Sequence, residues 1–418
     1  MLVHKKYEKE EKGRIMKEKY IVITLGLLPF IMVLGNSMLI PILPAIQNEL
    51  HLTEFQTGLV LSSFSIPAAL FIPLIGVLSD WYGRKRFIVV SMLLLITGSL
   101  MAIASGYVSS DRSGFYLLLA GRVIQGMGAA GTTPLAMALA GDLFQQEKRS
   151  KVLGIIEVYN GAGKVVAPII GATAALFAWY SAFYVYPFVA LFILYGVLRY
   201  VGKDRAAQDT ISIGGYLQKT WKVLKREGTW LLPLFFTGGL GLFLLFGTLY
   251  YLSFLIEETY HIDGFFKGTA FAFPLGAMTV TSYWTGKRIK NERQLMNKLL
   301  AIGVMLVMLS FASLIFLQTL AALMFLTTIG FGGLGFVLPC ANMMITSVVA
   351  DEERGFVVSL YGAVRFIGVA LGPIVFGKWM GNVEEMFYYC FMLTLLTFGW
   401  LFIRGNRLKV ANPSANKG

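Results

Sequence analysis

The sequence has few of the side chains with which enzymes and metal proteins work. Among its 418 residues there are two cysteines, Cys340 and Cys390, and three histidines, His4, His51 and His261. Both cysteines fall within apolar runs, so we expect no disulfide, and no metal-ligand spacing occurs. The chain also lacks a Gly-x-x-x-x-Gly-Lys-Ser/Thr phosphate loop, which argues against ATP as a direct energy source. We therefore expect no enzyme, no cofactor and no metal.

Charged residues are scarce as well. They make up 14% of the chain, whereas 56% is hydrophobic and the mean hydropathy is +0.68. The 45 glycines agree with a membrane protein, because glycine is commoner in membrane helices than in soluble ones. A helix needs roughly 20 apolar residues to cross the hydrocarbon layer. The runs close to that length are 20–43, 55–78, 87–107, 116–141, 151–177, 182–200, 230–255, 267–285, 297–317, 321–347, 356–378 and 385–404.

The positive charges indicate the orientation of these runs. All but six of the 36 lysines and arginines fall in the two tails, the central linker or every second loop. The other loops hold only Arg112, Lys267 and Lys378. By the positive-inside rule we expect a multi-pass cell-membrane protein with both termini cytoplasmic. The net charge of +13 then reflects topology, and it gives no reason to expect nucleic acid as a partner.

The chain divides into two halves of six runs each. Residues 20–200 and 230–404 form the expected halves, with cytoplasmic tails at 1–19 and 405–418. Tail 1–19 has neither an apolar core nor a cleavage site and is therefore not a signal peptide. The linker 201–229 is polar, and its basic residues suggest an amphipathic helix on the inner leaflet.

An internal repeat supports this division. A shift of 205 positions carries Gly128, Pro134, Glu147, Arg149, Gly163 and Pro168 onto Gly333, Pro339, Glu352, Arg354, Gly368 and Pro373. We therefore predict an all-α membrane protein of twelve transmembrane helices in two pseudo-symmetric halves. Proteins built in this way bind their cargo between the halves.

The run that contains Gly154–Ala172 carries charge within the membrane. Glu157 and Lys164 are seven residues apart, on nearly the same helix face. Pro168 should kink this helix, since it removes a backbone donor. A stripe of small residues permits close helix packing, and it consists of Gly163, Ala167 and Gly171. An ionisable group at membrane depth is by default a functional hypothesis.

Two interpretations of these charges stay open. Glu157 could carry protons, because burial and a nearby cation shift a carboxyl pKa in opposite directions, or it could be a paired structural acid. Lys164 could neutralise Glu157, or it could attract an anionic substrate. Arg365, in the equivalent run of the second half, favours the anionic interpretation, unless it only contacts Asn342 or backbone carbonyls.

Other polar groups in the apolar runs are further candidates. Arg122, with Gln125 one turn deeper, could tune a nearby carboxylate or hydrogen-bond neighbouring carbonyls. Asn36 is an isolated amide and a candidate for the substrate cavity. Phe243 represents the aromatic side chains that could line this cavity, although most of them should pack or lie at the membrane interface.

A loop between the second and third runs predicts a gate on the inner side. Asp80 and Arg84 are one turn apart at a helix end, and Asp142 is a plausible partner for Arg84. Asp80 could also face the amino-terminal end of the eleventh run, where the helix dipole favours a carboxylate. Such a latch would form in one conformation and break in the other; the alternative is a static clamp.

These residues resemble the motifs of the major facilitator superfamily, in particular its twelve-helix proton-coupled efflux branch. The loop residues that carry the resemblance are Gly76, Asp80, Gly83, Arg84 and Arg86, with Trp81 where the family usually has a basic residue. Arg122, Gln125, Gly126 and Gly128 are similar to the fourth-helix motif, whose arginine is linked with proton coupling. Gly154, Gly163, Pro168 and Gly171 are similar to the antiporter motif of the fifth helix, with Ala167 and Ala172 in place of glycines.

The resemblance implies a proton-coupled exporter of small molecules of the multidrug-efflux type. An exporter of an endogenous anionic metabolite such as a catecholate siderophore, a flippase for a lipid-linked sugar and a proton-coupled nutrient importer are the alternatives. A membrane enzyme would need convergent nucleophiles or metal ligands, and a sensor would usually carry a soluble signalling domain. The expected partners are the substrate, protons and the lipid bilayer, and we expect a monomer.

Overall fold

The computed structural model describes residues 2–202, 213–289, 292–348 and 351–405, and in these ranges every regular element is a helix. The first half contains α1 (Leu2–Ser37), η1 (Ile40–Ile42), α2 (Leu43–Glu49), α3 (Glu54–Tyr82), α4 (Arg84–Ser105), α5 (Asp111–Ala129), α6 (Thr133–Leu143), α7 (Gln146–Ala175), η2 (Trp179–Tyr184) and α8 (Val185–Tyr200). The second half contains α9 (Ile213–Phe254), the π-helical turn η3 (Leu255–Thr259), α10 (Gly264–Arg288), α11 (Arg293–Leu314), α12 (Leu320–Val348), α13 (Asp351–Trp379) and α14 (Val383–Gly405).

The helices follow the twelve apolar runs. Within the described residues, nine helical segments are long and apolar enough to cross a membrane by length and composition. The three remaining runs correspond to α5 with α6, to α10 and to α14. The all-α fold with twelve transmembrane helices, which the sequence predicted, is therefore confirmed.

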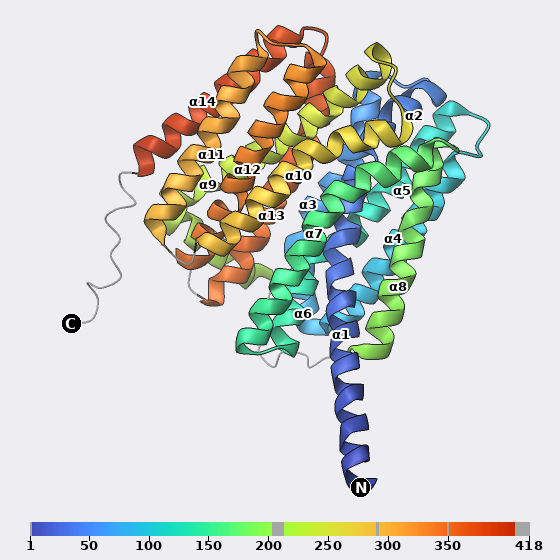
Figure 1. Ribbon diagram of the computed structural model, residues 1–418, viewed down its shortest axis with the longest axis vertical. Coiled ribbons are helices and arrows are strands. Elements are labelled where there is room, and N and C mark those ends of the chain that lie inside the picture. Colours follow the sequence, from blue (N-terminus) through green and yellow to red (C-terminus); the bar gives the residue numbers. More distant parts are fainter. Residues whose placement is uncertain (1, 203–212, 290–291, 349–350, 406–418) are drawn as a thin grey trace.

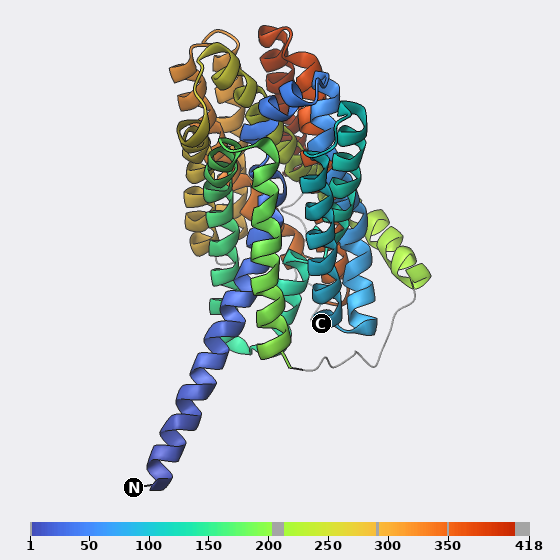
Figure 2. The same ribbon diagram turned by 90° about the vertical axis from the view of Figure 1, so that its right-hand side faces the viewer.

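Helices α1 and α9 are longer than the apolar runs that they contain. Helix α1 starts at Leu2, so most of the tail 1–19 continues the first helix and extends beyond the bundle (Figures 1 and 2). Helix α9 starts at Ile213, so the end of the linker 201–229 is continuous with the seventh run. In Figure 2 this first part of α9 projects from the side of the bundle. Residues 203–212 of the linker lie outside the described residues.

The fourth run, expected as one helix, is broken between α5 and α6. Helix α5 ends at Ala129, and α6 begins at Thr133 with Pro134 in its first turn. Proline is tolerated there because the first backbone N–H groups of a helix have no intrahelical acceptor. The break coincides with a close approach to α4, where a Cβ added at Gly131 would overlap the Ser91 hydroxyl.

Glycines bring helices together in the same way in both halves. A Cβ at Gly128 would lie 2.6 Å from the Ser91 carbonyl oxygen on α4. A Cβ at Gly333, its equivalent in the repeat, would lie 2.6 Å from the Gly303 carbonyl oxygen on α11. Both distances are too short for a side chain, so only glycine permits these backbone contacts. The repeat seen in the sequence thus corresponds to repeated packing of α4 on α5 and of α11 on α12.

The two halves contact each other mainly through α3 with α13 and through α7 with α10 (Figure 1). We call the end of the bundle that carries Arg84 and Lys148 the basic end, and the other the opposite end. Near the opposite end the Ser62 hydroxyl donates to the Ala370 carbonyl at 2.6 Å, and Tyr250 donates to the Glu54 carbonyl at 2.9 Å. Ser253 donates to the Ile40 carbonyl at 2.7 Å. These bonds join the halves at that end.

Candidate transport site

Arg122 lies in a closed network of hydrogen bonds inside the first half. Its side chain is fully buried on α5, and it donates through Nε to the Val60 carbonyl at 3.1 Å. Its two terminal nitrogens donate to the Gly35 carbonyl, the Asn36 amide oxygen and the Gln125 amide oxygen at 2.7–2.8 Å. All of these acceptors are neutral. Arg122 therefore joins α5 to α1 and α3, as in the simpler of its two sequence interpretations.

Gln125 and Asn36 belong to the same network. The Gln125 amide donates to Ser99 at 2.7 Å, and the Asn36 amide donates to Ser65 at 2.5 Å. Asn36 is 3% exposed, and both ends of its amide are occupied. In this conformation Asn36 therefore takes part in the Arg122 network, and its proposed place in the substrate cavity stays a prediction. A single sequence could not reveal these bonds, because the partners lie 29 and 86 positions away.

Lys164 lies on the face of α7 opposite the exposed apolar residues of this helix. The exposed apolar residues Ile155 and Val166 lie about 160–180° around the helix from Lys164 and from Glu157. Lys164 is half-buried, and Glu157 is exposed on this inner face. The Lys164 ammonium interacts electrostatically with Glu157 and with Arg365 of the other half. In the described part of the chain no carboxylate lies within 4 Å of it, so a Glu157–Lys164 ion pair is not formed.

Arg365 differs from Arg122 in having no hydrogen-bond acceptor among the described residues. It is half-buried on α13, and its Nε is buried without a partner. The guanidinium lies over the Tyr361 ring, with 5.6 Å between its central carbon and the ring centroid. Arg365 also interacts electrostatically with the Lys164 ammonium, so one cation from each half acts on the other.

Arg84 lies between two acids at the basic end. It contacts Asp142 at 2.5 Å and Asp80 at 3.2 Å, and both carboxylates are about half exposed. Gly83 makes the turn between α3 and α4 with φ of +100°, a conformation that favours glycine. Gly76 faces Ser359 of α13, whose hydroxyl oxygen would be 3.7 Å from an added Cβ, and Arg86 is exposed in the first turn of α4. The static geometry does not separate a switching latch from a clamp, so the latch stays a prediction.

The kink and packing residues do not all behave alike. A Cβ at Gly171 would overlap the Met38 carbonyl, and one at Gly368 would overlap the Gly239 carbonyl. Gly163 is in tight contact with Phe30, whereas Gly154 has no neighbour within 4 Å of an added Cβ. Pro168 and Pro373 each pack against a glycine of the other half. A Cβ added at Gly268 would lie 2.8 Å from the Pro168 carbonyl oxygen, and one added at Gly58 would lie 3.1–3.3 Å from the backbone of Pro373 and Ile374.

Phe243 belongs to an aromatic cluster within the second half. Its ring centroid is 5.6 Å from that of Phe376 and 6.1 Å from that of Trp379. It is partly buried, so its proposed place in a substrate cavity stays a prediction. These contacts are the packing that we expected for most aromatics.

Sequence analysis missed one buried ion pair. Lys267, counted as a loop charge, is fully buried in the first turn of α10 and contacts Glu257 of η3 at 2.5 Å. Only a short turn separates η3 from α10, so an acid and a base ten residues apart can lie close together. This spacing was the one signal in the sequence that could have predicted the pair. The pair lies near the opposite end, beside the bonds of Tyr250 and Ser253 to the first half.

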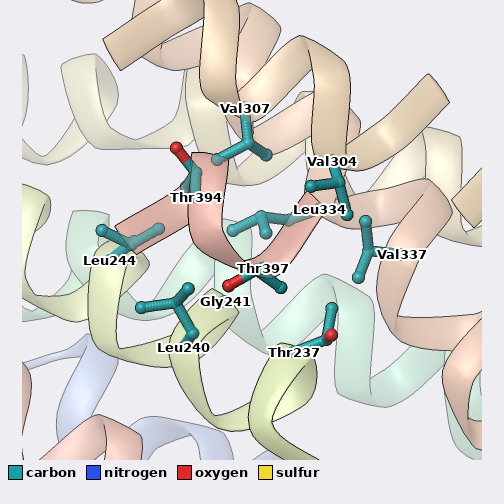
Figure 3. Close-up of a pocket in the computed structure, with 10 residues that line it drawn as sticks. All are labelled: Thr237, Leu240, Gly241, Leu244, Val304, Val307, Leu334, Val337, Thr394 and Thr397. Carbon is teal, nitrogen blue, oxygen red and sulfur yellow. The ribbon is translucent and has the colours of Figure 1, made fainter. Parts of the chain in front are cut away.

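A small pocket lies inside the second half, between α9, α11, α12 and α14 (Figure 3). Its volume is about 20 Å³, and it is lined by Thr237, Leu240, Gly241, Leu244, Val304, Val307, Leu334, Val337, Thr394 and Thr397. The three threonine hydroxyls donate to carbonyls of their own helices. None of the predicted site residues lines this pocket, so it is distinct from the inner faces of α7 and α13.

The family comparison agrees with this architecture. Residues 25–373 match the model of the Major Facilitator Superfamily. The match covers most of the chain. The protein belongs to the Major Facilitator Superfamily, and it is a multi-pass membrane transporter of small molecules rather than an enzyme.

Individual relatives are consistent with this assignment. The chain is 37% identical over 381 residues to the bacillibactin exporter of Bacillus subtilis (strain 168). This alignment covers 90% of this chain and 94% of the relative. It is 30% identical over 142 residues to multidrug resistance protein 3 of the same organism, covering 34% of this chain and 26% of the relative. The human organic anion transporter MFSD10 (TETRAN) has the same fold, with a TM-score of 0.67, 20% identity and coverage of 92% and 99%.

Proposed function

We propose that the protein exports an anionic small molecule in exchange for protons, with a bacillibactin-like catecholate siderophore as the leading substrate. This is the alternative that the sequence placed second, after multidrug efflux. The observation that carries it is the pair Lys164 and Arg365. Both cations lie in equivalent runs of the two halves, on helices that each contain a proline, and neither has a carboxylate within ion-pair distance among the described residues.

Electrostatics favours an anionic substrate. A cation inside the membrane costs at least about 2.5 kcal/mol, and more when another cation faces it. A bound anion would offset that cost, whereas a lipophilic cation would add to it. Substrate binding between the halves would thus be driven by charges that the empty protein leaves unbalanced.

The relatives support the same substrate class. The match to the bacillibactin exporter spans nearly the full length of both chains, whereas the match to the multidrug protein covers about a third of this one. We therefore rank general drug efflux second. Flipping of a lipid-linked sugar and import of a nutrient remain further alternatives without an observation in their favour.

Proton coupling is the second part of the proposal, and Glu157 is its candidate residue. Its carboxylate is exposed on the inner face of α7, where it can exchange protons with water, and it feels the Lys164 charge. A substrate anion that binds Lys164 would compete with Glu157 for the same cation, which would link substrate binding to Glu157. We further propose that the basic end is cytoplasmic, that the Asp80–Arg84–Asp142 cluster is the inner latch, and that the transporter is a monomer.

The test is transport by the full-length protein in proteoliposomes. Release of a catecholate siderophore against its gradient should require an imposed pH difference, and the substrate should in turn drive proton movement. A panel with neutral and cationic dyes provides the comparison. Transport of the cationic dyes with no movement of any anion would support the multidrug alternative and reject this proposal.

A further inference from the structure

Asn160 and Arg365 occupy equivalent positions in the two halves. The shift of 205 residues that carries Gly163 to Gly368 and Pro168 to Pro373 also carries Asn160 to Arg365. Both side chains end in a buried polar atom without a hydrogen-bond partner: the Asn160 Oδ1 and the Arg365 Nε. An unsatisfied buried polar group typically costs about 1–3 kcal/mol. Two such groups at repeat-equivalent positions therefore call for a functional explanation.

Both side chains also lie on the inner faces of their helices. Exposed apolar residues mark the outer surface: Ile155, Val158 and Val166 on α7, and Ile367 and Leu371 on α13. Asn160 and Arg365 each lie about 120–160° around the helix from these residues. Asn160 is one turn from Lys164, whose ammonium interacts electrostatically with Arg365. Asn160 is thus one turn from one of the two cations, Lys164, and Arg365 is itself the other cation.

The chemistry of the two atoms is complementary. The Asn160 Oδ1 can only accept a hydrogen bond, and the Arg365 Nε–H can only donate one. A ligand that satisfies both must carry a donor hydrogen beside an oxygen acceptor. An anion that bears a catechol ring, such as a dihydroxybenzoate, has this pattern, because a phenol O–H donates while a neighbouring oxygen accepts. A simple carboxylate would satisfy the cations and Arg365 but leave Asn160 unsatisfied.

We infer that Asn160 and Arg365 are repeat-equivalent halves of a substrate-recognition site that distinguishes phenolic O–H-bearing anions from anions without this donor. Asn160 accepts from the phenol, Arg365 donates through Nε to the neighbouring oxygen, and Lys164 supplies further charge. The inference rests on the proposed export of anions, and it adds the specificity-determining residue Asn160.

The experiment compares two probes of equal charge, 2,3-dihydroxybenzoate and 2,3-dimethoxybenzoate, whose affinities for the full-length protein in lipid nanodiscs are measured. We expect the wild-type protein to prefer the dihydroxy compound by about 5- to 10-fold, as one or two hydrogen bonds provide. Asn160→Leu should remove this preference and leave the affinity for the dimethoxy compound unchanged. Asn160→Gln, which keeps the acceptor, should retain part of it.

Two further variants identify the cause of any change. Arg365→Lys keeps the charge but lacks Nε–H, so it should weaken binding of both probes, since each carries an acceptor oxygen there, and should leave the preference for the dihydroxy compound largely intact. Ser310→Ala, which removes a buried unsatisfied hydroxyl from α11, is the matched control and should leave the preference intact. Equal binding of both probes by the wild type, or an unchanged preference in Asn160→Leu, would overturn the inference. Binding of neither probe would instead contradict the proposed anion export.

Discussion

Arg122 and Arg365 are both arginines within transmembrane helices, one in each half, yet their surroundings differ. Arg122 is fully buried, and all three of its nitrogens donate to oxygens of α1, α3 and α5. Arg365 is half-buried, and its Nε has no acceptor. An arginine that donates from all three nitrogens to neutral acceptors within the fold stabilises the fold. A buried Nε–H without an acceptor costs free energy, which a ligand that accepts from it would offset.

A third arginine, Arg84, completes the comparison. It lies at the basic end between Asp80 and Asp142, so its partners are charged and exposed to water. Exposed ion pairs contribute only about 0–1 kcal/mol to stability. Loss of the Arg84 pairs should therefore affect conformational switching more than folding.

The largest effect on stability should come from Arg122→Ala. The substitution leaves the Val60 and Gly35 carbonyls and two amide oxygens without their donor, and we expect a loss of about 3 kcal/mol or more. Arg365→Ala should change stability by less than about 1 kcal/mol, because no hydrogen bond is lost. Unfolding midpoints in detergent test both. Similar losses in the two variants would contradict the difference between the two arginines.

Transport should be most affected by Asp80→Asn. Because the side chain is about half exposed, we expect normal folding and insertion but a severe loss of transport. Glu147→Gln breaks another exposed pair at the same end, with Lys151, and is the matched control. Initial transport rates in proteoliposomes provide the measurement. A normal rate in Asp80→Asn would remove the latch from the mechanism.

Gly171→Ala should destabilise the protein by about 1–3 kcal/mol, the usual cost of overpacking. Its new methyl group would overlap the Met38 carbonyl on the chain that follows α1. Gly154→Ala, in the same motif, should be neutral or slightly stabilising, since nothing lies within 4 Å and alanine favours helix. Thermal unfolding of the two variants tests whether a glycine of this motif contributes to stability only where it is tightly packed. Equal unfolding temperatures would contradict this.

Glu157→Gln removes one exposed carboxylate and should have little effect on stability. Uphill export should be lost while substrate binding persists, because the amide cannot exchange a proton. Glu18→Gln, which removes an exposed acid paired with Lys148, is the control. Accumulation against a gradient by Glu157→Gln, driven by an imposed pH difference, would show that another group carries the proton.

The sequence predicted the fold well because its signals are local. Apolar length indicated the spans, and glycines at a constant offset indicated the repeat. The site was harder to predict because its determinants are contacts between distant segments. The bonds of Asn36 to Ser65 and Arg122 could not be predicted, and the Lys267–Glu257 pair was missed because Lys267 was counted as a loop charge. Lys164 and Arg365 could be proposed from the sequence because a charge within an apolar run is visible there, and their role stays a prediction.

One measurement tests directly whether Lys164 and Arg365, which have no carboxylate partner among the described residues, bind the substrate. Export of an anionic compound and of a neutral analogue of the same size is compared in wild type, Lys164→Ala and Arg365→Ala, with equal protein in each proteoliposome preparation. We predict that each variant reduces anion export at least about 10-fold, corresponding to the loss of one charge-assisted interaction, and leaves neutral export nearly unchanged. Equal loss for both compounds, or rescue of Lys164→Ala by Glu157→Gln, would contradict the claim that these cations bind the substrate.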